Sequence, residues 1–243
     1  MKPLTHRLND PRHNHLLAAF PNADWQHWQS LLEPVELSVG QVLFEPGRTP
    51  AHVYFPTTAV ISLVYMTQDG ETAEIAVVGN EGVVGVSLFM NGDVAPHEAN
   101  VQSAGMAYRL NASSVKNAME FSNQIMKLML NYAYDMFSQV SQTAVCNRYH
   151  SIDQQLSRRL LQGLDRATSN ELLITQEAMA SLLGVRREGV TAAALKLQHE
   201  GAIQYSRGHI VVYDRQRLER HACECYAFSK KGYFKLLPLP LAA

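Results

Sequence analysis

Residues 174–213 read ITQEAMASLLGVRREGVTAAALKLQHEGAIQYSRGHIVVY. Apolar residues recur at helical spacing on both sides of Gly184, and this pattern predicts two short helices. Glycine accepts the positive φ that a tight turn between helices requires. The alternating residues around Arg207-Gly208 predict a small β-hairpin after the second helix. The predicted order is therefore helix, turn, helix and wing.

The start of the second predicted helix carries side chains suited to a DNA major groove. Arg187 can bond to O6 and N7 of guanine, and Glu188 can accept a hydrogen bond from N4 of cytosine. Thr175 is expected to cap the first helix, whose free amides can hold a backbone phosphate. The remaining predicted phosphate contacts are Gln176, Arg186 and Arg207. These residues favour double-stranded DNA as the partner over a helix-turn-helix that serves only protein packing.

Composition supports two domains with different partners. The chain has 243 residues, 47% of them hydrophobic, and three cysteines. Residues 1–145 carry 7 basic and 13 acidic residues, whereas residues 146–243 carry 14 and 9, so only the second part is expected to meet phosphate. The sequence lacks a long apolar run and a secretory signal, and its cysteines are sparse. We therefore expect no membrane segment and a cytoplasmic location.

The region between residues 35 and 110 consists of short β-rich runs separated by glycine and proline. The clearest turn is Asp69-Gly70. Many short strands at this spacing predict an antiparallel sandwich or barrel. Residues 15–33 are predicted to form one or two short helices, broken at Pro21.

A long helix is predicted from Asn111 or Ser113 to about residue 143. Apolar residues recur there at alternating spacings of four and three, which is a heptad pattern. A sustained heptad needs a partner helix, so the pattern favours a homodimer over a monomeric helix buried on both sides. The residues assigned to the dimer interface are Met119, Met126, Met129, Ala133, Met136 and Val140.

The block ITQEAMASLLGVRREGV, with LKLQHEGAI and GHIVVY after it, resembles the Crp/Fnr superfamily of transcription regulators. The likeness extends from about His15 to Tyr213. It implies an α+β chain with an N-terminal double-stranded β-helix, a jelly roll of the cyclic-nucleotide-binding type. It also implies a long dimerisation helix and a C-terminal winged helix-turn-helix. The boundaries expected here are 15–112, 113–145 and 146–225, with a tail at 226–243. Superfamily members bind two-fold symmetric operators as homodimers and act on RNA polymerase.

The resemblance also assigns base reading to Arg187 and Glu188, and phosphate contacts to Thr175 and Gln176. Many relatives carry a second arginine one turn after the Arg-Glu pair. Here Ala192 occupies that place beside Thr191, which predicts an operator that differs at one base in each half-site.

The predicted sensor departs further from its relatives. Cyclic-nucleotide binders of the superfamily hold ribose with a Gly-Glu pair and phosphate with an Arg-Ser pair. Here Gly85 stands in place of the glutamate, and His97-Glu98 stands in place of the Arg-Ser pair. Because Glu98 repels phosphate and neutral His97 attracts it weakly, we expect no tight binding of cyclic AMP or cyclic GMP. The candidate residues for another effector are Gly85, Val86, Ser87, Leu88, His97 and Glu98.

Other cofactors find little support in the sequence. No cysteine precedes Cys146, which argues against the N-terminal iron–sulfur cluster of the redox branch, while scattered histidines leave a haem ligand open. The segment around Cys223 and Cys225 looks metal-like but has no fourth partner nearby. We therefore expect ordinary, partly buried thiols and no metal, with a metal or thiol switch as the alternative.

The sequence contains no Ser/His/Asp set, HExxH or paired-carboxylate motif, so we expect no enzymatic activity. The leading hypothesis is a homodimeric regulator that senses an effector and reads DNA. The alternatives are a constitutive DNA-binding regulator with a vestigial sensor, and a ligand- or protein-binding adaptor that does not bind DNA.

Overall fold

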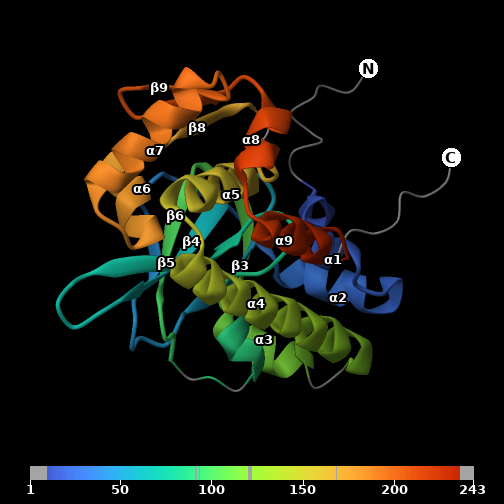
Figure 1. Ribbon diagram of the computed structural model, residues 1–243. Helices are drawn as coiled ribbons and strands as arrows, with labels where there is room; N and C mark the ends of the chain where they lie inside the picture. The colour runs from blue at the N-terminus through green and yellow to red at the C-terminus, as the bar shows by residue number, and fades with distance from the viewer. Residues whose placement is uncertain (1–9, 91, 93, 120–121, 168, 236–243) are drawn as a thin grey trace, which may run out of the picture. The chain divides into compact units, whose positions relative to one another are not determined.

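The computed structural model describes residues 10–90, 92, 94–119, 122–167 and 169–235 (Figure 1). These residues belong to two compact units. The first comprises the described residues of 1–62, 78–137 and 233–243, and the second comprises those of 63–77 and 138–232. The second unit thus contains a β-hairpin from the middle of the chain as well as the C-terminal part.

The first unit begins with η2 (Pro11–His13), α1 (His15–Ala18) and α2 (Asn22–Leu31). The buried Asn14 side chain accepts a hydrogen bond from the Leu17 amide and donates to the carbonyls of Pro56 and Gly82. Pro21 directly precedes α2, with the φ of −57° that its ring imposes. The predicted break between the helices at Pro21 is confirmed.

Short strands follow between residues 33 and 111. Their bounds are β1 (Glu33–Leu37), β2 (Val42–Phe44), β3 (His52–Pro56), β4 (Val60–Met66), β5 (Thr72–Val78), β6 (Glu98–Ser103) and β7 (Gly105–Asn111). They form sheets with the strand orders β1-β7-β3 and β2-β6-β4-β5. At the predicted turn, Gly70 has a φ of 84° and its amide donates to the Thr67 carbonyl. The predicted antiparallel sandwich is confirmed.

The core of the first unit lies where strand side chains meet the helices. Val53, Phe55 and Leu110 from the strands form one buried cluster with Leu16 and Trp28 from α1 and α2. Burying each large apolar side chain stabilises the fold by roughly 1.5–3 kcal/mol. This packing also holds the short helix η3 (Val86–Met90), which carries several of the expected effector residues.

The single long helix expected from Ser113 is instead two helices, α3 (Ala112–Met119) and α4 (Asn123–Tyr149). Ser122 lies before α4, where its hydroxyl oxygen accepts from the Ile125 amide and its hydroxyl donates to Asp24. A serine at this position satisfies an amide that has no partner within the helix. The heptad pattern passes through Ser122 without revealing this start. Residues 120 and 121 lie outside the described residues.

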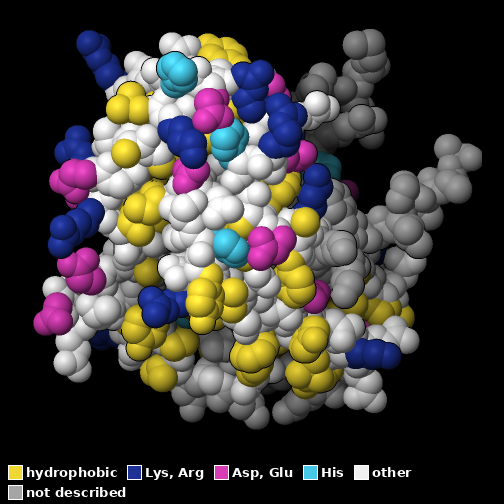
Figure 2. Space-filling model, viewed as in Figure 1, with side chains coloured by type: hydrophobic (Ala, Val, Ile, Leu, Met, Phe, Trp, Pro, Cys, Tyr) yellow, Lys and Arg dark blue, Asp and Glu magenta, His cyan; other side chains and the backbone are white. Residues whose placement is uncertain are grey.

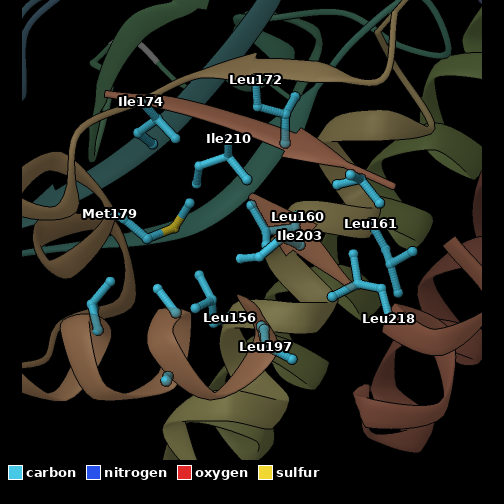
Figure 3. Close-up of a cluster of buried hydrophobic side chains, with 14 of the residues drawn as sticks. Leu156, Leu160, Leu161, Leu172, Ile174, Met179, Leu197, Ile203, Ile210 and Leu218 are labelled. Carbon is cyan, nitrogen blue, oxygen red and sulfur yellow. The ribbon is translucent and has the colours of Figure 1, made fainter. Parts of the chain in front are cut away.

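The C-terminal part of the second unit is a winged helix-turn-helix, as predicted. Its elements are α5 (Ile152–Leu164), β8 (Glu171–Leu173), α6 (Gln176–Leu183), α7 (Arg187–His199), β9 (Ile203–Ser206), β10 (His209–Val212), α8 (Arg215–His221) and α9 (Glu224–Lys235). The strands form a sheet in the order β8-β10-β9. Figure 3 shows Leu156 and Leu160 of α5 facing Leu197 of α7 and Ile203 of the wing in one buried cluster.

Two boundaries differ from those expected. Helix α4 continues to Tyr149, beyond the expected boundary at residue 145, and α5 begins only at Ile152, where Ser151 and Gln154 form a capping box. Helix α9 continues to Lys235, whereas the chain after residue 225 was expected to be a tail. Residues 236–243 lie outside the described part of the chain. Among the helices that the structure describes, none is long and apolar enough to cross a bilayer.

Candidate nucleic-acid interface

The turn between α6 and α7 has the local chemistry that the sequence predicted. Thr175 caps α6, since its Oγ1 atom accepts from the Ala178 amide at 3.1 Å. Gly184 ends α6 with a φ of 65°, a conformation that costs glycine little. Ala180 and Leu183 are buried beside Val190 of α7. The turn and this packing thereby fix the orientation of α7 relative to α6.

Helix α7 begins with exposed charged residues. Arg186 occupies its N-cap position with extended backbone, and Arg187 is its first residue. The Arg187 side chain is 63% exposed, and its Nε atom lies 3.9 Å from a carboxylate oxygen of Glu177. An ion pair this exposed contributes little. Breaking the contact with Glu177 so that the Arg187 guanidinium can reach a base edge would therefore cost little free energy.

The predicted base-reading residues share one side of α7. They line a shallow recess of about 360 Å³ whose residues are Arg187, Glu188, Thr191, Ala192 and Leu195. Val190, Ala194 and Leu197 point the other way and are buried. In Figure 2 charged side chains of both signs cover the region of α6 and α7. Because Ala192 ends at its methyl group, this face presents one cationic side chain followed by a small apolar surface.

Gln176, one of the predicted phosphate contacts, also contacts other elements of this domain. Its backbone amide donates to the Tyr205 hydroxyl of the wing at 3.1 Å. Its side-chain oxygen accepts from the Thr191 hydroxyl at 2.8 Å. Sequence reasoning treated α6 in isolation, whereas the wing folds back onto the start of this helix. Gln176 thus joins α6, α7 and the wing.

Arg207 and Gly208 form the tip of the wing, between the paired residues Ser206 and His209. Their φ angles are 46° and 86°, as in the two-residue turns that favour hairpins. Arg207 is exposed. The predicted hairpin is confirmed, and a cationic side chain stands at its end.

The turn of the β4–β5 hairpin belongs to the same unit and borders the recognition helix. Gly70, Glu71 and Thr72 line a groove of about 680 Å³ together with residues of the α6–α7 turn, including Arg186 and Arg187. The start of α7 therefore faces a segment taken from the β-strand region of the chain.

Comparisons with known proteins divide the chain in the same way. Residues 34–121 match the cyclic nucleotide-binding domain, and residues 154–221 match the Crp-like helix-turn-helix domain. The chain belongs to the Crp/Fnr superfamily. It is a Crp/Fnr-type transcription regulator with a helix-turn-helix DNA-binding domain.

Several known proteins are similar to most of this Crp/Fnr chain. The CRP-like cAMP-activated global transcriptional regulator of Mycobacterium tuberculosis is 24% identical over 201 residues, which cover 79% of this chain and 88% of the relative. A putative Crp/Fnr regulator from Eubacterium rectale has a TM-score of 0.69 at 19% identity, covering 86% of this chain and 98% of the other. FixK2 from Bradyrhizobium japonicum has a TM-score of 0.65 at 16% identity, covering 79% and 98%.

The effector candidates of this Crp/Fnr chain lie around η3 and the start of β6. Gly85 has a φ of 96°, and a Cβ atom there would meet Val53 at 3.2 Å. Burial lowers the pKa of His97, which disfavours its charged form, and Glu98 accepts from Asn100. The Leu88 side chain packs into the hydrophobic core. Val86 and Ser87 are half-buried, and residues 91 and 93 lie outside the described residues.

The apolar face that α4 presents differs from the predicted seam. Met129 is only 1% exposed and belongs to the core of its own chain, so it is corrected as a dimer contact. Leu130, Tyr134 and Phe137 are 54%, 68% and 69% exposed. Apolar side chains gather over α4 in Figure 2. The other predicted contacts, Met126, Ala133, Met136 and Val140, are half-buried, and the Met119 side chain lies outside what the structure describes.

Sequence reasoning missed a side-chain cluster in the second unit. Cys146 was taken to be remote from Cys223 and Cys225, yet the Sγ atoms of Cys146 and Cys223 are 3.5 Å apart. A hydrogen bond from Cys146 and other polar contacts lower the pKa of Cys223 to about 5 against the opposing effect of burial. The pKa of Cys146 is raised by that hydrogen bond and by burial, and lowered by the charge of Arg158.

The fourth member of this cluster is His150. Its Nδ1 atom lies 3.5 Å from the Cys225 Sγ atom. His221, two residues before Cys223 in the sequence, instead pairs with Glu200. The signal that could have found the cluster was a cysteine and a histidine four residues apart at the end of one helix.

Proposed function

We propose that this regulator binds a two-fold symmetric operator as a homodimer and reads bases with Arg187 and Glu188. The observation that carries this proposal is the position of both residues on the open side of α7, at the end nearest the turn. In helix-turn-helix proteins, residues at the start of the second helix contact base edges. Thr191 and Ala192 complete this surface, and Arg186 and Arg207 meet the backbone phosphates.

The proposed dimer forms through α4. Leu130, Tyr134 and Phe137 recur at spacings of four and three on one helix and are exposed, and large apolar side chains grouped in this way mark interaction surfaces. A second copy of the same helix is the partner of matching shape. Pairing would supply the two recognition helices that a symmetric site requires.

The β domain is proposed to bind an effector other than cyclic AMP or cyclic GMP. A cyclic nucleotide brings a phosphate charge that needs a cationic partner. The place expected for that partner holds His97, whose pKa is lowered by burial, and the acidic Glu98. Through linkage, the effector and the operator would each change the affinity for the other. RNA polymerase is the further partner that family membership suggests, and the proposed regulator acts in the cytoplasm, where its operator lies.

Operator selection from random duplex DNA, followed by fluorescence anisotropy over a range of salt concentrations, tests this proposal. The expected result is a palindromic site whose affinity falls steeply with salt, because phosphate contacts release counterions. An adaptor that does not bind DNA would enrich no palindrome. A constitutive regulator would bind the site with an affinity that no cell metabolite changes. Calorimetry with cyclic AMP and cyclic GMP is expected to show no tight complex.

A further inference from the structure

All the cysteines of the chain meet in one place. Cys146 lies near the end of α4, and Cys223 and Cys225 lie at the junction of α8 and α9, about eighty residues later. The three side chains are buried, and the imidazole of His150 lies beside them. One ligand atom from each of the four residues falls within 4.8 Å of the others. We propose that Cys146, His150, Cys223 and Cys225 bind one thiophilic divalent metal ion, with Zn²⁺ as the preferred ion.

Local structure explains how four side chains reach a common point. Cys146 lies on α4, and His150 directly follows the last residue of that helix. The His150 amide donates to the Cys146 carbonyl at 3.1 Å, so the helical spacing of four residues continues and both side chains lie on the same side. Cys223 precedes α9, and its carbonyl accepts from the Tyr226 amide, while Cys225 lies in the first turn of α9. This arrangement directs both sulfur atoms of a Cys-X-Cys segment towards the end of α4.

The distances suit a tetrahedral ion. Zinc binds sulfur at about 2.3 Å and imidazole nitrogen at about 2.0–2.1 Å. Tetrahedral angles then place two sulfurs about 3.8 Å apart, and a sulfur and a nitrogen about 3.5 Å apart. The Cys146–Cys223 sulfur distance is 3.5 Å, and the distance from Cys225 Sγ to His150 Nδ1 is also 3.5 Å. All four ligand atoms lie within 4.8 Å of one another, so closing the set around an ion would shorten the separations by about 1 Å or less.

The groups around the four ligands resemble those that support metal sites. Glu224 lies 3.2 Å from Nε2 of His150, and a carboxylate on the outer nitrogen fixes the tautomer that leaves Nδ1 free to bind metal. Gln142 donates to the Cys225 sulfur at 2.8 Å, as expected of a group that stabilises a thiolate.

Charge balance points the same way. Arg158 is 4% exposed, and among the described residues its Nε atom has no hydrogen-bond partner. Its Nη1 atom reaches only the neutral oxygens of Thr143 and Gln162, both at 3.5 Å. Three thiolates and one divalent ion carry a net charge of −1, so the loaded site would provide the anionic neighbour that this buried guanidinium needs.

The donor set selects the class of ion. Three sulfurs and one imidazole in a tetrahedral, closed arrangement are typical of structural zinc and unlike the oxygen-rich sites of Mg²⁺ or Ca²⁺. Each thiol that still holds its proton releases it to solvent as the metal binds, while His150 binds as the neutral ring. The ion would cross-link α4 to the α8–α9 junction and so stabilise the position of α9.

Cobalt binding to the full chain tests the proposal. The protein is purified under reducing conditions, stripped with chelator and titrated with Co²⁺. We expect one equivalent of Co²⁺ to produce thiolate-to-metal charge-transfer bands and the intense visible bands of tetrahedral cobalt. One equivalent of Zn²⁺ should abolish both and raise Tm by several degrees.

Variants separate this site from adventitious binding. Cys223→Ser and His150→Asn should lose the tetrahedral spectrum, and Glu224→Gln should weaken metal affinity by about 10–100-fold. His199→Asn, at an exposed histidine of α7, is the matched control and should bind as the wild type does. Circular dichroism verifies that each variant folds. If a cysteine variant unfolds, Glu224→Gln still tests the site, because it changes only an exposed carboxylate and leaves all four ligands in place.

Two results would overturn the proposal. One is a folded, reduced protein that takes up no cobalt and forms only a Cys146–Cys223 disulfide on oxidation. The other is cobalt uptake that Cys223→Ser and Glu224→Gln leave unchanged. Neither result depends on DNA binding.

Discussion

Thr191 of α7 donates its hydroxyl proton to the side-chain oxygen of Gln176, the first residue of α6, over 2.8 Å. The same glutamine donates its backbone amide to Tyr205 of the wing. One residue therefore joins the two helices and the wing at the surface proposed to meet DNA. This arrangement orients α7 through Thr191, while the side chains of Arg187 and Glu188, which are proposed to read bases, take no part in it.

Replacing Thr191 by valine tests this link. Thr191→Val keeps the volume of the side chain but leaves the Gln176 oxygen without its donor. We expect a loss of about 1 kcal/mol in the free energy of unfolding. Operator affinity should fall at every site while base preference persists. Urea unfolding and anisotropy on operator variants measure both effects, and an altered base preference would show that Thr191 itself reads a base.

Arg187→Ala is expected to remove discrimination at one G·C pair in each half-site. The binding free energy for the preferred base at that pair should weaken by about 1–3 kcal/mol. Arg207→Ala, in the wing, provides the comparison. It should weaken all sequences to a similar extent and reduce the salt dependence of binding. Binding to a panel of operator variants separates the two roles, and full preference retained by Arg187→Ala would refute base reading by that residue.

A buried ion pair within the second unit predicts a large effect on stability. Arg159 of α5 donates to Glu74 of β5 at 2.8 Å, and both side chains are almost wholly buried. Arg159→Met leaves the Glu74 carboxylate without its main partner, and we expect a loss of about 3–5 kcal/mol. Adding Glu74→Leu to the same protein should recover much of the lost unfolding free energy, because no buried carboxylate then remains without a partner. Chemical denaturation of the two single variants and the double variant checks this, and additive losses would contradict it.

Phe137→Glu should dissociate the proposed dimer, because a charge would be buried where two α4 helices meet. Phe137 is 69% exposed in the single chain, so the monomer itself should stay folded. Tyr65→Glu, at another exposed aromatic residue, is the control. Sedimentation velocity gives the outcome. A Phe137→Glu protein that remains dimeric would place the interface elsewhere.

Acid is expected to weaken one contact in the helix-turn-helix domain. Hydrogen bonds from Lys196 and Ser151 lower the pKa of Asp153, and Lys196 Nζ lies 2.7 Å from its carboxylate. Since the folded-state pKa lies below the unfolded value, the contribution is complete above about pH 4 and is lost as the pH falls through the folded-state pKa. Lys196→Met should reduce the difference in unfolding free energy between pH 5 and pH 3. The effect should stay below about 1 kcal/mol because the pair is partly exposed.

Features that depend on neighbours in sequence were predicted well. The Thr175 cap, the turn at Gly184, the Asp69-Gly70 turn and the wing tip at Arg207 all follow from preferences of a few adjacent residues. Errors arose where a local pattern permits two outcomes. The heptad in α4 shows that two faces are apolar, but not which of them packs into the core of its own chain. It therefore could not show that Met129 is internal and Phe137 exposed.

The sequence by itself determined the class of protein, because helical and strand periodicities and turn residues act over short distances and specify the order of elements. Only the tertiary structure decided which distant side chains meet. Tyr205 reaches the amide of Gln176, and Cys146 and His150 reach Cys223 and Cys225, because hydrophobic packing of α5, α7 and the wing brings distant segments together. Burial acts on any apolar side chains that the fold brings together, so residue spacing by itself does not specify which distant side chains meet.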